Sequence, residues 1–166
     1  MNKLSSFTFV AKTDAQILIL GSMPSEQSLA QQQYYAHPRN AFWKIITELF
    51  NLPLDLNYQE KRSALTEHKI ALWDVIQSCE REGSLDSNIK SVMTNNFAEF
   101  FAQHTDIKHI FFNGSCAYNE YQKRVLPNLA KVWQDLPRTR LPSTSPAMAS
   151  LTFEEKLTAW QQIKIN

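Results

Sequence analysis

Short runs of apolar residues alternate along the chain with stretches in which apolar residues recur at helical spacing. Three runs consist mainly of apolar residues and predict buried strands, at Ile17 to Leu20, Ile70 to Val75 and Ile107 to Phe112. A fourth, shorter strand is expected at Arg138 to Leu141. Strands that alternate with helices indicate an α/β fold, a three-layer sandwich around a mostly parallel sheet.

The helical pattern is clearest after position 39, where one face collects the apolar residues Phe42, Ile45, Ile46 and Leu49. Further helices are expected at 58–68, near 96–103, from about position 115, and after Thr152, which forms a capping box with Glu155. A long polar loop follows the first strand, and the segment 77–88, QSCEREGSLDSN, also reads as a loop.

The unusual polar segments of this chain all follow predicted strands. They are 21–40, 73–87, 113–114 and 141–147. In a parallel sheet the carboxyl ends of the strands meet at one edge, where such folds bind their ligands. Four separate loops are therefore expected to form one site.

Composition narrows the class of protein. The 166 residues suit one globular domain over positions 1–166, and 43% hydrophobic with 20% charged residues argues against disorder. No apolar run approaches the roughly 20 residues that cross a bilayer, and the start of the chain does not resemble a signal peptide. Cys79 and Cys116 lie far apart, which favours a reduced, cytoplasmic setting. We expect a monomer.

Several common chemistries are excluded by the residues present. Three glycines, at 21, 83 and 114, cannot build a dinucleotide fingerprint or a phosphate-binding P-loop. There is no GxSxG elbow, and the four histidines have no metal-ligand spacing. The net charge of +1 does not by itself indicate a nucleic-acid partner, so any such surface must be local.

What remains is an aromatic loop that enters a helix, YYAHPRNAFW at 34–43. Aromatic rings, an amide and a helix N-terminus suit a nucleobase, because extruded bases are held by stacking and by hydrogen bonds to their edges. Phe42 and Trp43 fit equally the core of an amphipathic helix. For Tyr34 and Tyr35, core and function are both open.

Several segments of the chain resemble those of a known family. The matching segments occur in the family's order: GSMPS (21–25), SL (28–29), YYAHPRNAFW (34–43), ALWDV (71–75), GSLDSNI (83–89), FFNG (111–114) and LPSTSPA (141–147). Together they look like the hypoxanthine-DNA glycosylases, also called DNA-deoxyinosine glycosylases, a branch of the uracil-DNA glycosylase superfamily. The resemblance implies a four-stranded parallel sheet flanked by helices and a monofunctional glycosylase without a cofactor.

The resemblance also assigns the catalytic amide. Many superfamily members carry a catalytic Asp or Asn directly after the glycine of the first loop, where this chain has Ser22. The hypoxanthine branch places its amide in the HPRN motif, here Asn40, which is the expected catalytic residue. This difference favours hypoxanthine over uracil. Asn40 would orient a water molecule beneath C1′, since an amide cannot deprotonate it.

A second set of residues is expected to bind the base: Ser22, Met23, Tyr35, Asp74 and Asn113. Met23 stands where this branch often has an aromatic residue, so that Tyr35 is the candidate to stack on the base. Asp74 and Asn113 end predicted strands and could read the base edge. They fit equally a loop or helix cap at Asp74 and a turn residue before Gly114.

A third set is expected to bind DNA: His37, Arg39, Arg140, Ser143, Thr144, Ser145 and Pro146. The hydroxyls of LPSTSPA can donate to phosphates, while its prolines stiffen the loop and 146–148 can fill the gap left by a flipped base. The segment fits an ordinary turn-rich connection as well.

The expected function is removal of hypoxanthine from DNA in base excision repair, by an enzyme that contacts the nucleoid if the source is bacterial. No metal is expected, and two cysteines cannot hold the four-cysteine iron–sulfur cluster of some superfamily branches. Three different functions stay open: a uracil or mismatch glycosylase, a non-catalytic module that binds damaged DNA, and a hydrolase of free nucleosides.

Overall fold

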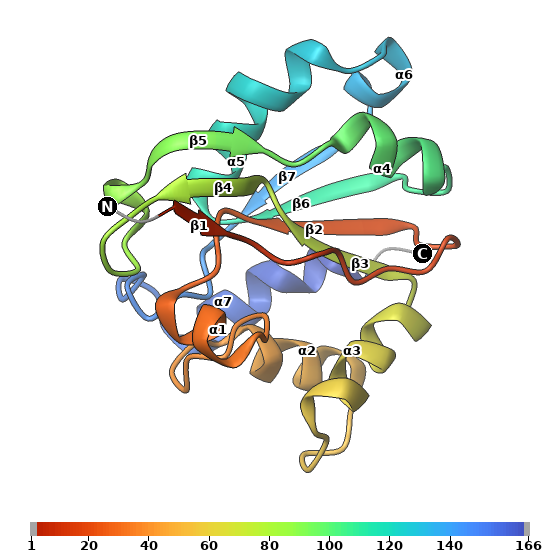
Figure 1. The fold of residues 1–166 in the computed structure, drawn as a ribbon. Coiled ribbons are helices and arrows are strands. Elements are labelled where there is room, and N and C mark those ends of the chain that lie inside the picture. The colour runs from red at the N-terminus through yellow and green to blue at the C-terminus, as the bar shows by residue number, and fades with distance from the viewer. Residues whose placement is uncertain (1–2, 165–166) are drawn as a thin grey trace.

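The computed structural model describes residues 3–164. Its centre is a parallel sheet with the strand order β3-β2-β6-β7, formed by β2 (Ile17–Gly21), β3 (Ile70–Asp74), β6 (His109–Asn113) and β7 (Arg138–Leu141). β2 and β3 are buried at every position, as expected for strands covered on both faces. The predicted three-layer α/β fold with four strands is confirmed, and each strand lies within two residues of its predicted position (Figure 1).

Helices cover both faces of this sheet. Below it in Figure 1 lie α1 (Glu26–Gln31), α2 (Phe42–Phe50), α3 (Tyr58–Glu67) and α7 (Phe153–Trp160). Above it lie α4 (Phe97–Gln103), α5 (Ser115–Glu120) and α6 (Lys131–Gln134). The alternation of side chains along β2 divides the core, because Ile17 and Ile19 pack on the α2 side while Leu18 and Leu20 pack on the α4 side.

Local sequence signals mark the start of two helices. Asn57 with Glu60 and Thr152 with Glu155 each form a complete capping box at the start of α3 and α7. Short helical turns complete the list: Asp86–Asn88, Leu126–Asn128 and Gln161–Ile163 are 3₁₀ helices, and Tyr121–Val125 continues α5 as a π-helix. Within residues 3–164, no helix has the length and hydrophobicity to span a membrane.

Two predicted loops contain regular structure. α1 lies in the polar segment after β2, where Ser25 caps it through the backbone N–H of Ser28. The prediction of a loop over 77–88 is wrong in its first part, because β4 (Ile76–Glu80) pairs antiparallel with β1 (Lys3–Ser5) and β5 (Lys90–Thr94). This small sheet, with the order β1-β4-β5, is built by pairing between segments far apart in the chain.

Candidate active site

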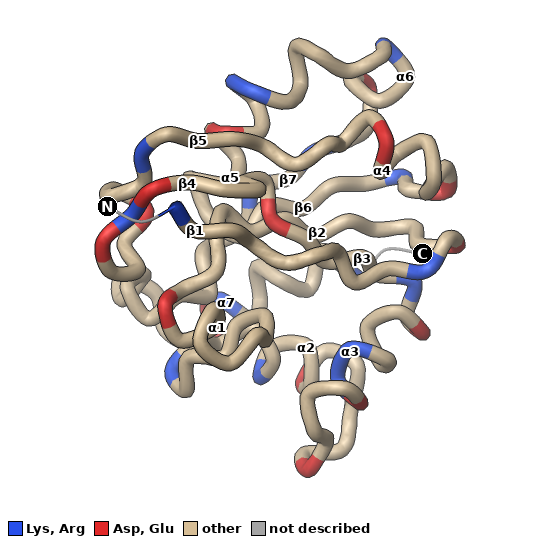
Figure 2. The backbone as a smooth tube through the Cα atoms, viewed as in Figure 1, with Lys and Arg blue, Asp and Glu red and all other residues tan. Residues whose placement is uncertain are grey.

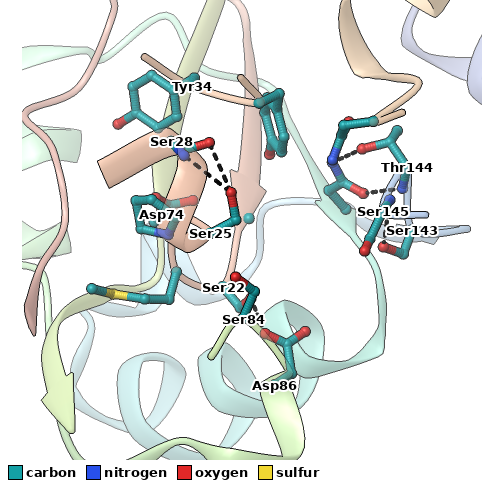
Figure 3. Close-up of a pocket in the computed structure, with 16 residues that line it drawn as sticks. Ser22, Ser25, Ser28, Tyr34, Asp74, Ser84, Asp86, Ser143, Thr144 and Ser145 are labelled. Atoms are coloured by element: carbon teal, nitrogen blue, oxygen red, sulfur yellow. Dashed lines mark hydrogen bonds between the residues drawn. The ribbon is translucent and has the colours of Figure 1, made fainter. Parts of the chain in front are cut away.

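The loops after the four parallel strands meet in one small pocket. Its volume is about 90 Å³, well below the roughly 300–1,000 Å³ of pockets for drug-sized ligands, so it suits a single flat ring system. Nine of the residues predicted to act in the site line it: Ser22, Met23, Tyr35, Asn40, Asp74, Asn113, Ser143, Thr144 and Ser145. In Figure 3, Asp74 and Tyr34 lie on one side of the pocket and Ser143–Ser145 on the other.

Asn40 lies where the pocket opens. It lines the pocket and also the two grooves that adjoin it. Its Oδ1 accepts a hydrogen bond from the backbone N–H of Phe42 at 2.9 Å. Because a backbone N–H can only donate, this contact fixes which end of the Asn40 amide is the carbonyl. The backbone of Ala41 donates to the Thr144 carbonyl at 3.0 Å, which ties this loop to the Ser143–Ser145 segment.

The aromatic residues around Asn40 divide into core and pocket. Phe42, Trp43 and Tyr34 are buried, and Trp43 Nε1 donates to the Tyr34 carbonyl at 2.8 Å, so the core interpretation of Phe42 and Trp43 is confirmed. Tyr35 has a left-handed backbone, with φ of 56°, and its ring stacks on Phe42 at a centroid distance of 4.2 Å. One face of the Tyr35 ring is therefore already covered. Met23 is buried against Ile76 and Cys79.

Asp74 forms the buried end of the pocket. The residue is 3% exposed, and its Oδ2 is a buried oxygen without a hydrogen-bond partner among the described residues. Burial, reinforced by the charge of Asp86 and opposed by Arg81, raises the pKa of Asp74 to about 7. The hydroxyl of Tyr35 is likewise buried and without a partner in the described part of the chain, and burial raises its pKa.

Gly21 makes room for these two polar groups. A Cβ at position 21 would lie 2.6 Å from Asp74 Oδ1 and 2.8 Å from the Tyr35 hydroxyl oxygen. Both distances are shorter than a Cβ tolerates, so any larger residue at this position would have to displace the Asp74 carboxyl and the Tyr35 hydroxyl.

The loop that contains Ser84 and Asp86 forms another side of the pocket and is held by hydrogen bonds. The Ser22 hydroxyl donates to Asp86 Oδ1 at 2.8 Å, and the Glu26 backbone N–H donates to Ser84 Oγ at 2.9 Å. The buried Arg81 guanidinium donates to the carbonyls of Gly83 and Pro24, both at 2.7 Å. Burial raises the pKa of Asp86, while the hydrogen bond from Ser22 opposes that change.

Seven residues of the pocket are not among the predicted site residues: Gly21, Pro24 and Tyr34, and four serine or aspartate residues. These four are Ser25, Ser28, Ser84 and Asp86. Their signal lies in the motifs GSMPS, SL and GSLDSNI, which carry the family resemblance without assigning a role to each side chain.

Asn113 and Thr144 join the loops after β6 and β7. Asn113 Nδ2 donates to Thr144 Oγ1, and the Thr144 backbone N–H donates to Asn113 Oδ1, both at 2.9 Å. The Ser143 hydroxyl accepts from the Ser145 backbone N–H at 3.1 Å. These contacts give the LPSTSPA segment a defined conformation at the edge of the pocket.

The remaining predicted DNA contacts are spread over the surface. His37 and Arg39 line a groove of about 700 Å³ beside the pocket, and Pro146 lines another groove with Leu85 and Ala147. Arg140 lies outside both, with its guanidinium 5.8 Å from the ring centre of Tyr118. The register explains this position, since Arg140 pairs with Phe112 and faces α5.

The groove beside Arg39 carries three lysines that are not among the predicted DNA-binding residues. Lys44, Lys61 and Lys156 line it, and no acidic residue does so within the described range. Figure 2 shows Lys and Arg at positions on α2, α3 and α7, all below the sheet. Lys156 is 6% exposed, and its Nζ donates to the Ser145 carbonyl at 3.4 Å.

Metal ligands are not grouped in residues 3–164, where no cluster of three or more His, Cys, Asp or Glu side chains could hold an ion.

Comparison with known proteins agrees with this geometry. The sequence model of the uracil DNA glycosylase superfamily matches residues 7–164. The chain is 38% identical to the hypoxanthine DNA glycosylase of Methanosarcina barkeri over 113 residues, which is 68% of this chain and 72% of that protein. It is 38% identical to the hypoxanthine DNA glycosylase of Methanosarcina acetivorans over 117 residues, 70% of this chain and 73% of that one.

A solved structure extends the match to nearly the whole chain. The solution NMR structure of a candidate uracil DNA glycosylase from Methanosarcina acetivorans superposes with a TM-score of 0.80 at 30% sequence identity, covering 99% of this chain and 100% of that one. The sequence and the fold thus lead to the same assignment. This chain belongs to the uracil DNA glycosylase superfamily and, within it, to the hypoxanthine DNA glycosylases.

Proposed function

We propose that the protein hydrolyses the N-glycosidic bond of deoxyinosine in DNA and releases hypoxanthine. The observation that carries this proposal is a base-sized pocket at the end of the parallel sheet, with Asn40 at its opening. Two relatives at 38% identity are named for this activity, and Ser22 stands where a catalytic carboxylate or amide would follow Gly21 in many members of the superfamily.

Asn40 is suited to position the attacking water. Cleavage passes through an oxocarbenium-like sugar, so the enzyme gains by holding a water at C1′ and by stabilising the departing base. One lone pair of Asn40 Oδ1 accepts from Phe42, and the second remains free for a water molecule. The contact with Phe42 fixes the orientation of the amide before DNA binds, so that little conformational entropy is lost on binding.

Water is also the nucleophile that the lining favours. Among the described residues that form the pocket, none is a lysine or a cysteine, the side chains that would attack C1′ to form a covalent enzyme intermediate. This supports a monofunctional enzyme that leaves an abasic site.

The basic groove next to Asn40 supports DNA as the partner. Arg39, Lys44, Lys61 and Lys156 line it together with His37. A track of cations beside the pocket would bind the phosphates of the strand that carries the flipped nucleotide, and phosphate contacts supply most of the affinity for DNA. The hydroxyls of Ser143 and Ser145 lie at the pocket edge, where they can donate to the phosphates that flank the lesion.

A second groove supports the proposed wedge. Pro146 and Ala147 line it together with Leu85, an apolar residue that is 54% exposed. Apolar side chains at such a rim can enter the base stack and fill the space left by the flipped base. An enzyme of this kind works on the chromosome, and we propose a monomer in the cytoplasm, on the nucleoid if the source is bacterial.

The decisive experiment uses duplex oligonucleotides that carry hypoxanthine, xanthine or uracil opposite each normal base. After incubation, alkaline scission reveals abasic sites. We expect cleavage at hypoxanthine and little at uracil. Strong cleavage of uracil–guanine duplexes would support the second candidate, a uracil or mismatch glycosylase, which the description of the solved relative favours.

The same oligonucleotides distinguish a glycosylase from a damage-binding module and from a nucleoside hydrolase. Tight binding to hypoxanthine duplexes without scission would indicate a module that only recognises damage. Release of hypoxanthine from free inosine, with no action on oligonucleotides, would indicate a nucleoside hydrolase.

A further inference from the structure

The Asp74 carboxyl and the Tyr35 hydroxyl approach the same point at the buried end of the pocket. Asp74 Oδ1 and the Tyr35 hydroxyl oxygen lie 2.6 and 2.8 Å from the same point, the place that a Cβ on Gly21 would occupy. The Tyr35 hydroxyl and Asp74 Oδ2 are buried and have no hydrogen-bond partner among the described residues. Buried polar atoms without partners are costly, and a ligand that supplies the partners recovers that cost.

The side-chain amide of Asn113, which also lines the pocket, already forms hydrogen bonds within the protein. Both ends of the Asn113 side chain bond Thr144, so its plane is set by the loop rather than by a base. Ser22 similarly donates to Asp86. Among the described polar atoms that line the pocket, Asp74 Oδ2 and the Tyr35 hydroxyl are the two that are buried without any hydrogen-bond partner.

Deamination changes the hydrogen-bonding edge of a purine in one specific way. Adenine presents an acceptor at N1 and an amino donor at C6. Hypoxanthine presents the reverse, a donor N1–H beside an acceptor O6. A carboxyl oxygen facing N1 therefore gains a hydrogen bond from hypoxanthine and meets another acceptor in adenine.

We propose that the Asp74 carboxyl accepts from N1–H of the flipped hypoxanthine while the Tyr35 hydroxyl donates to its O6. This inference deepens the proposed function, on which it rests, by assigning base recognition to these two residues rather than to Asn113. Because Gly21 has no side chain, both groups can approach the same point. The ionised form of Asp74 rejects adenine, because the carboxylate oxygen would face the lone pair of N1.

The direct test changes the base instead of the protein. A methyl group on N1 of hypoxanthine removes the donor and keeps O6. In single-turnover assays we expect the wild type to release 1-methylhypoxanthine at least about 100-fold more slowly than hypoxanthine. The Asp74→Ala variant should release hypoxanthine about 10- to 100-fold more slowly than the wild type. It should release hypoxanthine and 1-methylhypoxanthine at equal rates.

Two further variants separate recognition from folding. Asp74→Asn keeps an acceptor oxygen, so it should retain the preference for hypoxanthine over the methylated base. Tyr35→Phe keeps the ring that stacks on Phe42 and removes only the hydroxyl. Its matched control is Tyr121→Phe, which removes another buried hydroxyl without a described partner, on the far face of the sheet. We expect Tyr35→Phe to slow release by about tenfold, and the control to leave it unchanged.

Binding in the Asn40→Ala background gives a readout that needs no turnover. If the wild type releases no hypoxanthine, the proposed function fails, yet a preference of the Asn40→Ala protein for the unmethylated base that Asp74→Ala removes would still support the inference. If the wild type releases both bases at equal rates, or if Asp74→Ala keeps the full preference, the inference is overturned and the glycosylase assignment stands.

Discussion

The side chain of Asn113 and residue Thr144 hold each other through two hydrogen bonds, one in each direction and each 2.9 Å long. They connect the end of β6 to the LPSTSPA segment that follows β7. The catalytic loop joins the same point, because Ala41 donates to the Thr144 carbonyl. Thr144 is 1% exposed, so none of these contacts is replaced easily by water.

Asn113→Ala should loosen this junction. It removes both hydrogen bonds and leaves the buried N–H of Thr144 without a partner, at a cost of about 2 kcal/mol in the free energy of unfolding. Thr144→Val removes only the bond to Oγ1 and should cost about half as much. Urea denaturation measures both changes. Stability equal to that of the wild type in Asn113→Ala would contradict a structural role for the amide.

Asn40→Ala should stop excision with a modest loss of stability. The rate of hypoxanthine release is expected to fall at least about 100-fold, the effect typical of removing an oriented catalytic group. Loss of the contact to the Phe42 backbone should lower the free energy of unfolding by about 1 kcal/mol. Asn40→Asp keeps an acceptor for Phe42 and for water, so it should fold like the wild type and retain measurable excision. Full activity in Asn40→Ala would remove Asn40 from the catalytic role.

Gly21→Ala should damage the pocket although it adds one methyl group. The new Cβ would press on Asp74 Oδ1 and the Tyr35 hydroxyl oxygen, both under 3 Å away. Overpacking of this kind costs roughly 1–3 kcal/mol, and the displaced oxygens should weaken base binding. A Gly21→Ala, Asp74→Ala double variant should recover part of the lost stability, measured by thermal unfolding. Additive losses would show that the two residues do not interact.

The burial of Asp74 should make stability depend on pH. Its pKa rises from an ordinary 3.8 to about 7 in the folded protein. Between these values the folded state binds more protons than the unfolded state, so this carboxyl lowers stability as the pH rises through that window. Asp74→Asn is neutral throughout. We expect its free energy of unfolding to exceed that of the wild type by about 2–4 kcal/mol at pH 8. The difference should shrink toward zero as the pH falls to 4. A difference that stayed constant with pH would contradict the shift.

The basic groove should set the salt dependence of DNA binding. Each phosphate contact contributes about 0.9 to the slope of log affinity against log salt concentration. Lys44→Ala and Lys61→Ala should each lower that slope by about this amount for any duplex sequence. Lys123→Ala, on the π-helix at the opposite face of the sheet, is the matched control and should not change it. An equal effect of all three would indicate nonspecific charge attraction.

Much of the fold could be predicted because its signals are local. The apolar runs of β2, β3 and β6 and the capping boxes at Asn57 and Thr152 need no distant partner to be recognised. β4 and β5 escape such prediction because their residues alternate poorly and become strands only through pairing with each other and with β1. The single domain over 1–166 stays a prediction.

The site was predictable as a set of loops but not as a set of contacts. The position of each loop after a strand predicted that Asn40, Asp74 and Asn113 would meet, and they line one pocket. That Asn113 bonds Thr144 while Asp74 stays free depends on angles that no spacing encodes. The prediction for Arg140 rests on its neighbours in sequence, whereas the strand register turns it toward Tyr118.

The pocket draws on residues from Gly21 to Ser145, and β7, the last strand of the sheet, supports one side of it. Parallel strands pair only after long connections have closed, which makes such sheets slow to assemble. A chain in which β7 has not yet docked therefore lacks the side of the pocket formed by Ser143–Ser145. The pocket, and with it the activity, is therefore complete only after the final strand has docked.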